Sequence, residues 1–116
     1  MRTALRFDCV FYYVRDLDRA VDFYTRVLGL PLVSRDAVAR FQIDGVLFEL
    51  VPAKGGLRLD GNGNARLCLT AGDLREAKAE LEAAGVAVSG VQEASNGLLA
   101  TFEDLDGNEI ALWQYA

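Results

Sequence analysis

Few side chains in this sequence have the chemistry of a catalytic or metal-binding group. The chain contains no histidine, which is the commonest general base and transition-metal ligand in proteins. Its two cysteines, Cys9 and Cys68, are too few and too far apart for a zinc cluster, and such residues are more often buried thiols than a disulfide. Because no histidine or nearby lysine is present to lower the pKa of Cys9, a nucleophilic role is disfavoured.

The secondary-structure elements that must position these residues follow one pattern that occurs twice in the chain. Each copy begins with an apolar, strand-like run that ends in Asp-Leu before a helical spacing of apolar residues: CVFYYVRDL at 9–17 and RLCLTAGDL at 66–74. Asp16 and Asp73 are placed to cap the helices, and Gly29 and Gly85 to end them. The predicted strands are 7–14, 30–34, 38–43, 46–51, 65–70, 86–88, 97–102 and 109–115, with helices over 17–28 and 74–84.

Each copy is a βαβββ module whose sheet would have one uncovered face. We therefore predict an α+β fold in which two modules form a curled mixed sheet that encloses a cavity. The whole chain, 1–116, is expected to be a single domain, with module one over 5–52 and module two over 65–116. The glycine-rich, polar segment 53–64 is predicted to be the linker.

Strand alternation predicts which side chains line the cavity, since residues two apart share a face. The cavity-lining candidates are Cys9, Phe11, Tyr13, Leu47, Glu49, Val51, Arg66, Cys68, Thr70, Ala111 and Trp113. Apolar walls with a few polar groups are typical of a small-molecule pocket. Phe11 and Trp113 either stack on a planar ligand or fill the core.

Bulk composition excludes some classes of partner. The net charge is −5, with 17 acidic against 12 basic residues, which disfavours nucleic-acid binding. No apolar run is long enough to span a membrane, and the N-terminus lacks the pattern of a signal peptide. The expected location is therefore the cytoplasm, without a membrane partner.

Three segments carry a resemblance to a known family. VRDLDRAVDFYTRVLGLPLV, GDLREAKAELEAAGVAV and FEDLDGNEIALWQ resemble the glyoxalase/bleomycin resistance/dioxygenase superfamily, also called vicinal oxygen chelate. The resemblance implies a divalent metal held from four strand positions, which here are Cys9, Glu49, Arg66 and Ala111. Only Glu49 is a residue type that the family uses as a ligand at its position. Cys9 stands where the family usually has histidine, Arg66 has no lone pair to offer, and Ala111 has no donor atom. We therefore expect no metal and no other cofactor.

The charged residues at two of these positions suggest a replacement for the metal. We predict that Glu49 and Arg66 face each other as a charge-assisted pair, because the guanidinium can supply the positive charge that a buried carboxylate needs. The alternatives are that Arg66 binds a carboxylate or oxyanion of a ligand, or that the pair only neutralises itself.

The function that the resemblance implies is metal-independent binding of an unidentified small molecule, as in drug- or antibiotic-sequestering proteins of the bleomycin-resistance type. It also implies a homodimer with ligand grooves formed across it, in which strands or modules are exchanged between chains in some cases. One alternative is a lyase, isomerase or dioxygenase of the same superfamily with an atypical site, so the enzyme question stays open although a binder is favoured. A further alternative is a non-catalytic regulatory or protein-binding module.

Overall fold

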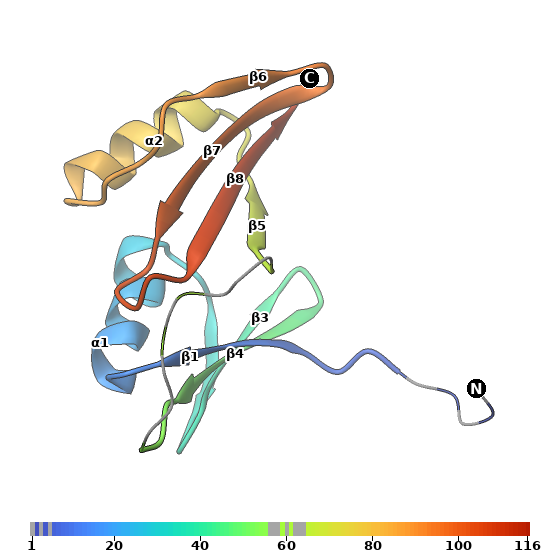
Figure 1. Cartoon of the computed structure of the whole chain (residues 1–116), viewed down its shortest axis with the longest axis vertical. Coiled ribbons are helices and arrows are strands. Elements are labelled where there is room, and N and C mark those ends of the chain that lie inside the picture. Colours follow the sequence, from blue (N-terminus) through green and yellow to red (C-terminus); the bar gives the residue numbers. More distant parts are fainter. Residues whose placement is uncertain (1, 3, 5, 56–58, 60, 62–64) are drawn as a thin grey trace. The chain divides into compact units, whose positions relative to one another are not determined.

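A computed structural model describes residues 2, 4, 6–55, 59, 61 and 65–116. The chain divides into two compact units, Met1–Lys54 and Gly55–Ala116, which contain the predicted modules one and two, respectively (Figure 1). Most of the predicted linker lies outside the described residues. None of the helices in the described part of the chain has the length and apolarity that a membrane crossing requires.

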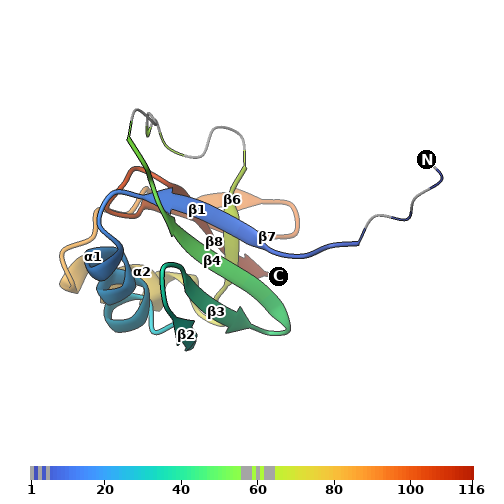
Figure 2. The ribbon, with the colours of Figure 1, turned by 90° about the horizontal axis from the view of Figure 1, so that it is seen from below.

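Module one is a four-stranded sheet with a helix on one face (Figure 2). Its sheet order is β1-β4-β3-β2, with β1 parallel to β4 and the other neighbours antiparallel. Its elements are β1 (Val10–Val14), α1 (Leu17–Asp22), the π-helix η1 (Phe23–Val27), β2 (Leu32–Arg35), β3 (Ala39–Ile43) and β4 (Val46–Pro52).

Module two repeats this arrangement. Its sheet order is β5-β8-β7-β6, again with only the first pair of neighbours parallel. Its elements are β5 (Leu67–Thr70), α2 (Leu74–Ala83), β6 (Gln92–Ala94), β7 (Gly97–Glu103) and β8 (Glu109–Tyr115). The prediction of two βαβββ modules in an α+β fold is confirmed.

The ends of both helices follow from their sequence. The Asp16 carboxylate accepts a hydrogen bond from the Arg19 amide at 3.1 Å, and Asp73 accepts one from the Glu76 amide at 3.0 Å. Gly29 and Gly85 adopt φ of 70° and 90°, the left-handed conformation that stops a helix.

The first helix differs from its prediction because it widens into a π-turn. The Leu28 amide donates to the Phe23 carbonyl at 3.1 Å, five residues back, instead of to the carbonyl four residues back. Phe23 and Tyr24 are both buried, with Tyr24 fully so. The wider turn therefore accompanies the burial of two consecutive aromatic residues.

The predicted strand at 86–88 is wrong. Only Val88 forms a bridge there, to Phe102, and the edge strand β6 lies further on. The physical reason is a side chain: the Thr101 amide donates to the hydroxyl of Ser89 at 2.8 Å, so β7 uses a serine side chain where a neighbouring strand would offer a carbonyl.

Each helix covers one face of its own sheet. In module one the buried face carries Tyr12, Val14, Ala39, Phe41, Phe48 and Leu50, which pack with Ala20, Phe23 and Tyr24. In module two the core consists of Leu74, Leu81, Ala100, Phe102, Ile110 and Leu112. We call the opposite face of each sheet its open face, and all predicted site residues on the strands belong to the open faces by alternation.

Candidate functional site

The open face of module one brings an aromatic and a charged group into one row. Glu49 of β4 is directly opposite Phe11 of β1 on one side and Arg40 of β3 on the other. Its carboxylate lies 3.4 Å from Nε of Arg40, and its side chain is only 18% exposed. Phe11 is 46% exposed and contacts Tyr13 edge to face, with ring centroids 5.3 Å apart. This face therefore offers aromatic surface beside a carboxylate that is already neutralised.

Cys9 belongs to the same cluster. Burial raises the pKa of its thiol above the ordinary value, and the negative charge of Glu49 and hydrogen bonds with Asp8 and Glu49 raise it further. A thiol of raised pKa is less often the reactive thiolate at neutral pH, which disfavours attack on a substrate.

Arg40 is a residue that sequence reasoning missed. It also pairs with Asp36, at 3.2 Å, and so links two carboxylates. The pKa of Asp36 is lowered by the hydrogen bond from the Val38 amide and then by the bond from Arg40. The signal was present: counting back from the Asp44-Gly45 turn along the hairpin places Arg40 opposite Glu49.

The open face of module two has different chemistry at the matching positions. Arg66 pairs with Glu109 at 3.1 Å and donates to the Ala65 carbonyl at 2.9 Å. Ala111 is buried between Cys68 and Thr101 on the neighbouring strands.

The aromatic end of this face lies further along β8. Trp113 is half-buried beside Thr70 and contacts Tyr115 edge to face, with ring centroids 5.8 Å apart. Leu47 and Val51, the remaining candidates on β4, are also half-buried.

The structure gives Glu49 and Arg66 each a partner inside its own module. Arg40 neutralises Glu49, and Glu109 neutralises Arg66. Glu109 was also missed, because the sequence does not show which carboxylate an arginine at the edge of a sheet will reach. Pairing of Glu49 with Arg66 would join the two modules, and it stays a prediction.

The four positions where the resemblance implies a metal do not carry a suitable set of donors. Cys9 and Glu49 each have a possible donor atom, but Arg66 is a cation held by Glu109, and Ala111 has no ligating atom. Among the described residues, no group of three or more acidic, cysteine or histidine side chains is arranged to hold a metal ion. A hard divalent cation at Glu49 would have too few ligands and would compete with Arg40.

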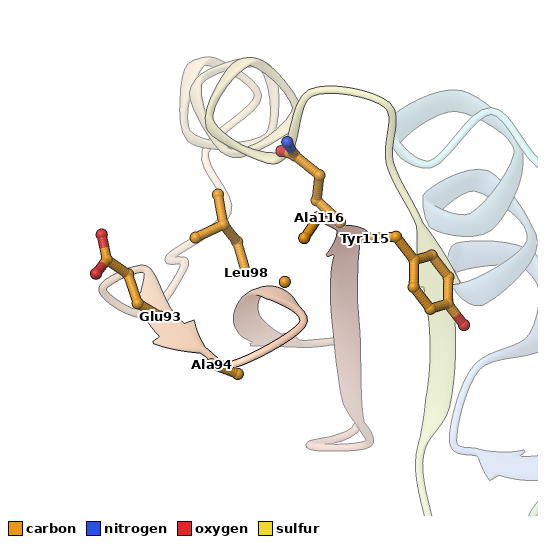
Figure 3. Close-up of a pocket in the computed structure, with 7 residues that line it drawn as sticks. Glu93, Ala94, Leu98, Tyr115 and Ala116 are labelled. Carbon is orange, nitrogen blue, oxygen red and sulfur yellow. The ribbon is translucent and has the colours of Figure 1, made fainter.

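A pocket of about 220 Å³ lies in module two, where β6, the start of β7 and the end of β8 meet (Figure 3). Glu93 and Tyr115 mark its two ends, and Leu98 lies between them. Its lining residues are Glu93, Ala94, Gly97, Leu98, Gln114, Tyr115 and Ala116. None of them was predicted as a site residue, and no sequence motif marks them.

Comparison with known proteins gives a family and several structural relatives. The family model described as Glyoxalase/Bleomycin resistance protein/Dioxygenase superfamily matches residues 6–112. Among proteins of curated function, no sequence matches this chain significantly.

Solved structures match over nearly the whole chain. TnmS3, an antibiotic binding protein from Streptomyces sp. CB03234, is 27% identical with a TM-score of 0.74, covering 98% of this chain and 100% of its own. A lactoylglutathione lyase from Agrobacterium tumefaciens is 22% identical with a TM-score of 0.76, covering 97% and 96%. The fosfomycin resistance protein FosX from Listeria monocytogenes is 14% identical with a TM-score of 0.79, covering 98% and 96%. The last two likenesses are evidence of fold alone.

Proposed function

Since the chain belongs to the glyoxalase/bleomycin resistance/dioxygenase superfamily, we propose that it binds a small organic molecule without a metal ion and sequesters it, as an antibiotic-binding protein does. The observation that carries this proposal is the open face of module one. There, aromatic rings adjoin a carboxylate that an arginine, instead of a metal, neutralises.

The chemistry of this face suits binding better than catalysis. Enzymes that polarise a substrate oxygen need an electrophile with a free coordination position. Here the Glu49 carboxylate is held by Arg40, and burial raises the pKa of the Cys9 thiol. Phe11 and Tyr13 supply exposed ring surface against which an organic ligand can bury apolar area.

One relative supports the antibiotic class of ligand. TnmS3, which is 27% identical to this chain over almost its full length, is an antibiotic binding protein. For our chain the ligand is proposed at the level of class only: an aromatic drug or antibiotic of small size.

A thermal-shift screen of the purified protein tests this proposal. We expect at least one cationic aromatic antibiotic or small organic acid to raise the melting temperature, because a ligand present at 100 times its Kd stabilises the folded form by about 2.7 kcal/mol. Phe11→Ala should abolish the shift, whereas Val33→Ala, which truncates an exposed apolar residue of β2, should preserve it. A screen without any binder would contradict the proposal.

Metal analysis separates the binder from the enzyme alternatives. We expect less than a tenth of an equivalent of any divalent metal after purification without chelator, because the donor set is incomplete. A stoichiometric ion that disappears in Glu49→Gln would favour a lyase, isomerase or dioxygenase with an atypical site. An empty screen together with no metal would favour a non-catalytic regulatory or protein-binding module.

The proposal includes a homodimer with ligand grooves between two chains. Light scattering coupled to size-exclusion chromatography should give twice the chain mass of 12.7 kDa. A monomer at micromolar concentration would remove this part of the proposal. The cytoplasmic location also stays a proposal, which fractionation of the source cells tests.

A further inference from the structure

The pocket of module two is built around a row of side chains on neighbouring strands. Glu93 of β6 is directly opposite Leu98 of β7, and Leu98 is directly opposite Gln114 of β8. Residues that are directly opposite on neighbouring strands share a face of the sheet, and Leu98 shares its face with Ala100 by alternation. Ala100 is a core residue on the face that α2 covers. The row therefore lies on the covered face of the sheet, whereas Trp113 belongs to the open face.

The side chain of Gln114 is fixed by one hydrogen bond and still has donors to offer. Its Oε1 atom accepts a hydrogen bond of 2.8 Å from the amide of Leu74, the first residue of α2. The NH2 group of the same side chain donates to no described residue. Since the described part of the chain has no buried side-chain nitrogen without a hydrogen-bond partner, Nε2 of Gln114 is accessible to solvent. An acceptor atom of a ligand can therefore bind there.

Glu93 offers the opposite chemistry at the other end of the row. Its side chain is exposed, and its carboxylate forms no ion pair with any residue that the structure describes. It differs in this from Glu49 and Glu109, whose charges arginine side chains neutralise. Next to Glu93, Leu98 adds an apolar wall to the pocket (Figure 3). An organic ammonium group can form an ion pair with this carboxylate while its carbon chain loses contact with water.

The size of the pocket limits the ligand. Its volume of about 220 Å³ is below the roughly 300–1,000 Å³ that is typical of sites for drug-sized molecules. Glu93 and Gln114 are two strands apart, so their backbones are separated by about 10 Å across the sheet. Because both side chains extend from the same face, a short carbon chain is enough to connect groups that bind at the two ends.

We propose that this pocket is a second binding site, and that it takes a small aliphatic amine with a hydrogen-bond acceptor at its other end. The ammonium group pairs with Glu93, the carbon chain packs on Leu98, and the acceptor receives a hydrogen bond from Nε2 of Gln114. This inference goes beyond the proposed function, because the row lies on a covered face and uses no residue of the open faces.

Three small compounds separate the contributions of the two ends. 6-Aminohexanamide has both an ammonium group and an amide oxygen, hexanamide lacks the ammonium group, and hexylamine lacks the acceptor. Amide signals in NMR spectra of isotope-labelled protein locate each compound, and their titration gives its Kd. We expect 6-aminohexanamide to shift the signals of Glu93, Leu98 and Gln114. The other two compounds should bind about threefold more weakly or worse, since an exposed ion pair or a single hydrogen bond contributes a factor of about two to ten.

A matched pair of glutamate variants tests the ammonium end. Glu93→Gln keeps the size of an exposed side chain and removes its charge, so 6-aminohexanamide should bind about threefold more weakly and lose the salt dependence of its affinity. Glu103→Gln is the control. It removes an exposed carboxylate at the far end of β7, which does not line the pocket, so the affinity should match that of the parent protein.

Gln114→Glu tests the acceptor end without removing the contact to α2. A carboxylate oxygen can still accept the hydrogen bond from the Leu74 amide, but the NH2 donors are gone. We therefore expect the preference for 6-aminohexanamide over hexylamine to disappear. If Gln114 only holds the start of α2, this preference will stay as it is in the parent protein.

The second site is overturned if 6-aminohexanamide at millimolar concentration shifts none of the pocket signals, or if Glu93→Gln binds it as tightly as the parent protein. An unchanged preference in Gln114→Glu overturns the role of the amide. Failure here is distinguishable from failure of the proposed function, because Phe11→Ala should abolish the thermal shift of an open-face ligand and leave 6-aminohexanamide binding intact.

Discussion

The two modules share a topology but differ in what their open faces carry. Both have a parallel first pair of strands, an aspartate-capped helix and an antiparallel hairpin after it. At matching places on β4 and β8, however, module one has Glu49, clamped by Arg40, and module two has Ala111, buried among small residues. The repeat therefore constrains the covered faces of the two sheets, whereas the open faces have diverged in their chemistry.

The cores differ as well, although both are apolar. In module one, Tyr24, Phe41 and Phe48 form a ring cluster with centroids 5.4 to 6.1 Å apart. In module two, leucine and isoleucine side chains take most of the same roles, with Phe102 as the aromatic member. The π-turn belongs to the aromatic module, where Phe23 and Tyr24 are both buried.

The largest effect should come from the ring cluster. Phe48→Ala should lower the free energy of unfolding by about 3–5 kcal/mol, because it leaves a cavity among rigid rings. Ile110→Val in module two removes a single methylene at a fully buried position and should cost about 0.5–1.5 kcal/mol. Urea unfolding followed by circular dichroism measures both, and a loss below 1 kcal/mol at Phe48 would contradict the assigned core.

The hairpin turns give a smaller contrast. Asp104 is buried and accepts hydrogen bonds from the amides of Asp106 and Asn108 and from the Asn108 side chain, at 2.8 to 2.9 Å. Asp104→Ala leaves these donors without that partner, so we expect a loss of about 2 kcal/mol or more. In module one the turn residue Asp44 is exposed at a φ of 49°, and Asp44→Gly should change stability by less than about 1 kcal/mol.

If urea unfolding showed equal losses of stability for Asp104→Ala and Asp44→Gly, the buried turn of module two would not matter more for stability than the exposed turn of module one. Asp104→Asn serves as a control, since the amide oxygen still accepts a hydrogen bond and should recover part of the loss.

Removal of either helix cap should lower stability by a similar amount, because both modules keep an aspartate cap. Asp16→Ala and Asp73→Ala each remove a carboxylate that accepts an amide hydrogen bond in the first turn. Each should lower the free energy of unfolding by about 1 kcal/mol, and replacement by Asn should restore most of it. If the two losses in free energy of unfolding differed by more than twofold, one aspartate would have a structural role beyond capping the first turn of its helix.

The fold could be predicted because its signals are local. Asp-Leu after an apolar run, a helical spacing of apolar residues and a glycine at the helix end each specify a few residues of structure without reference to the rest of the chain. The two failures lie where the signal is not local. The edge strand β6 is QEA, fully exposed, so no apolar pattern marks it. The π-turn depends on how Phe23 and Tyr24 pack against the sheet.

The candidate site was predictable only in part, for a related reason. Alternation along a strand assigned Phe11 and Tyr13 to one face, and their rings do meet there. The partners of the charged residues depend on cross-strand register. Arg40 was deducible from the tight Asp44-Gly45 turn. Arg66, in contrast, directly precedes β5 and Glu109 begins β8, and no short turn connects these two parallel strands.

The smallest effect should be on the reactivity of Cys9, and it tests whether Glu49 makes module one electrostatically different. In a Cys68→Ser background, we would measure the rate of Cys9 alkylation by iodoacetamide as a function of pH. Burial first, and then the charge of Glu49, hold the pKa of the Cys9 thiol above its ordinary value. Glu49→Gln removes the charge but not the burial, so the pKa should fall and the rate at pH 8 should rise by a few-fold.

Arg40→Met should have the opposite sign, since it removes the cation that offsets the Glu49 charge; the pKa of Cys9 then rises and the reaction slows. Glu82→Gln, an exposed carboxylate on α2, controls for the change in net charge and should leave the profile in place. If Glu49→Gln and Arg40→Met shift the profile in the same direction, the changes in reactivity reflect altered access to the sulfur. The charge of Glu49 would then have no effect on the pKa of Cys9. Glu49 in module one and Ala111 in module two would differ only in how they pack.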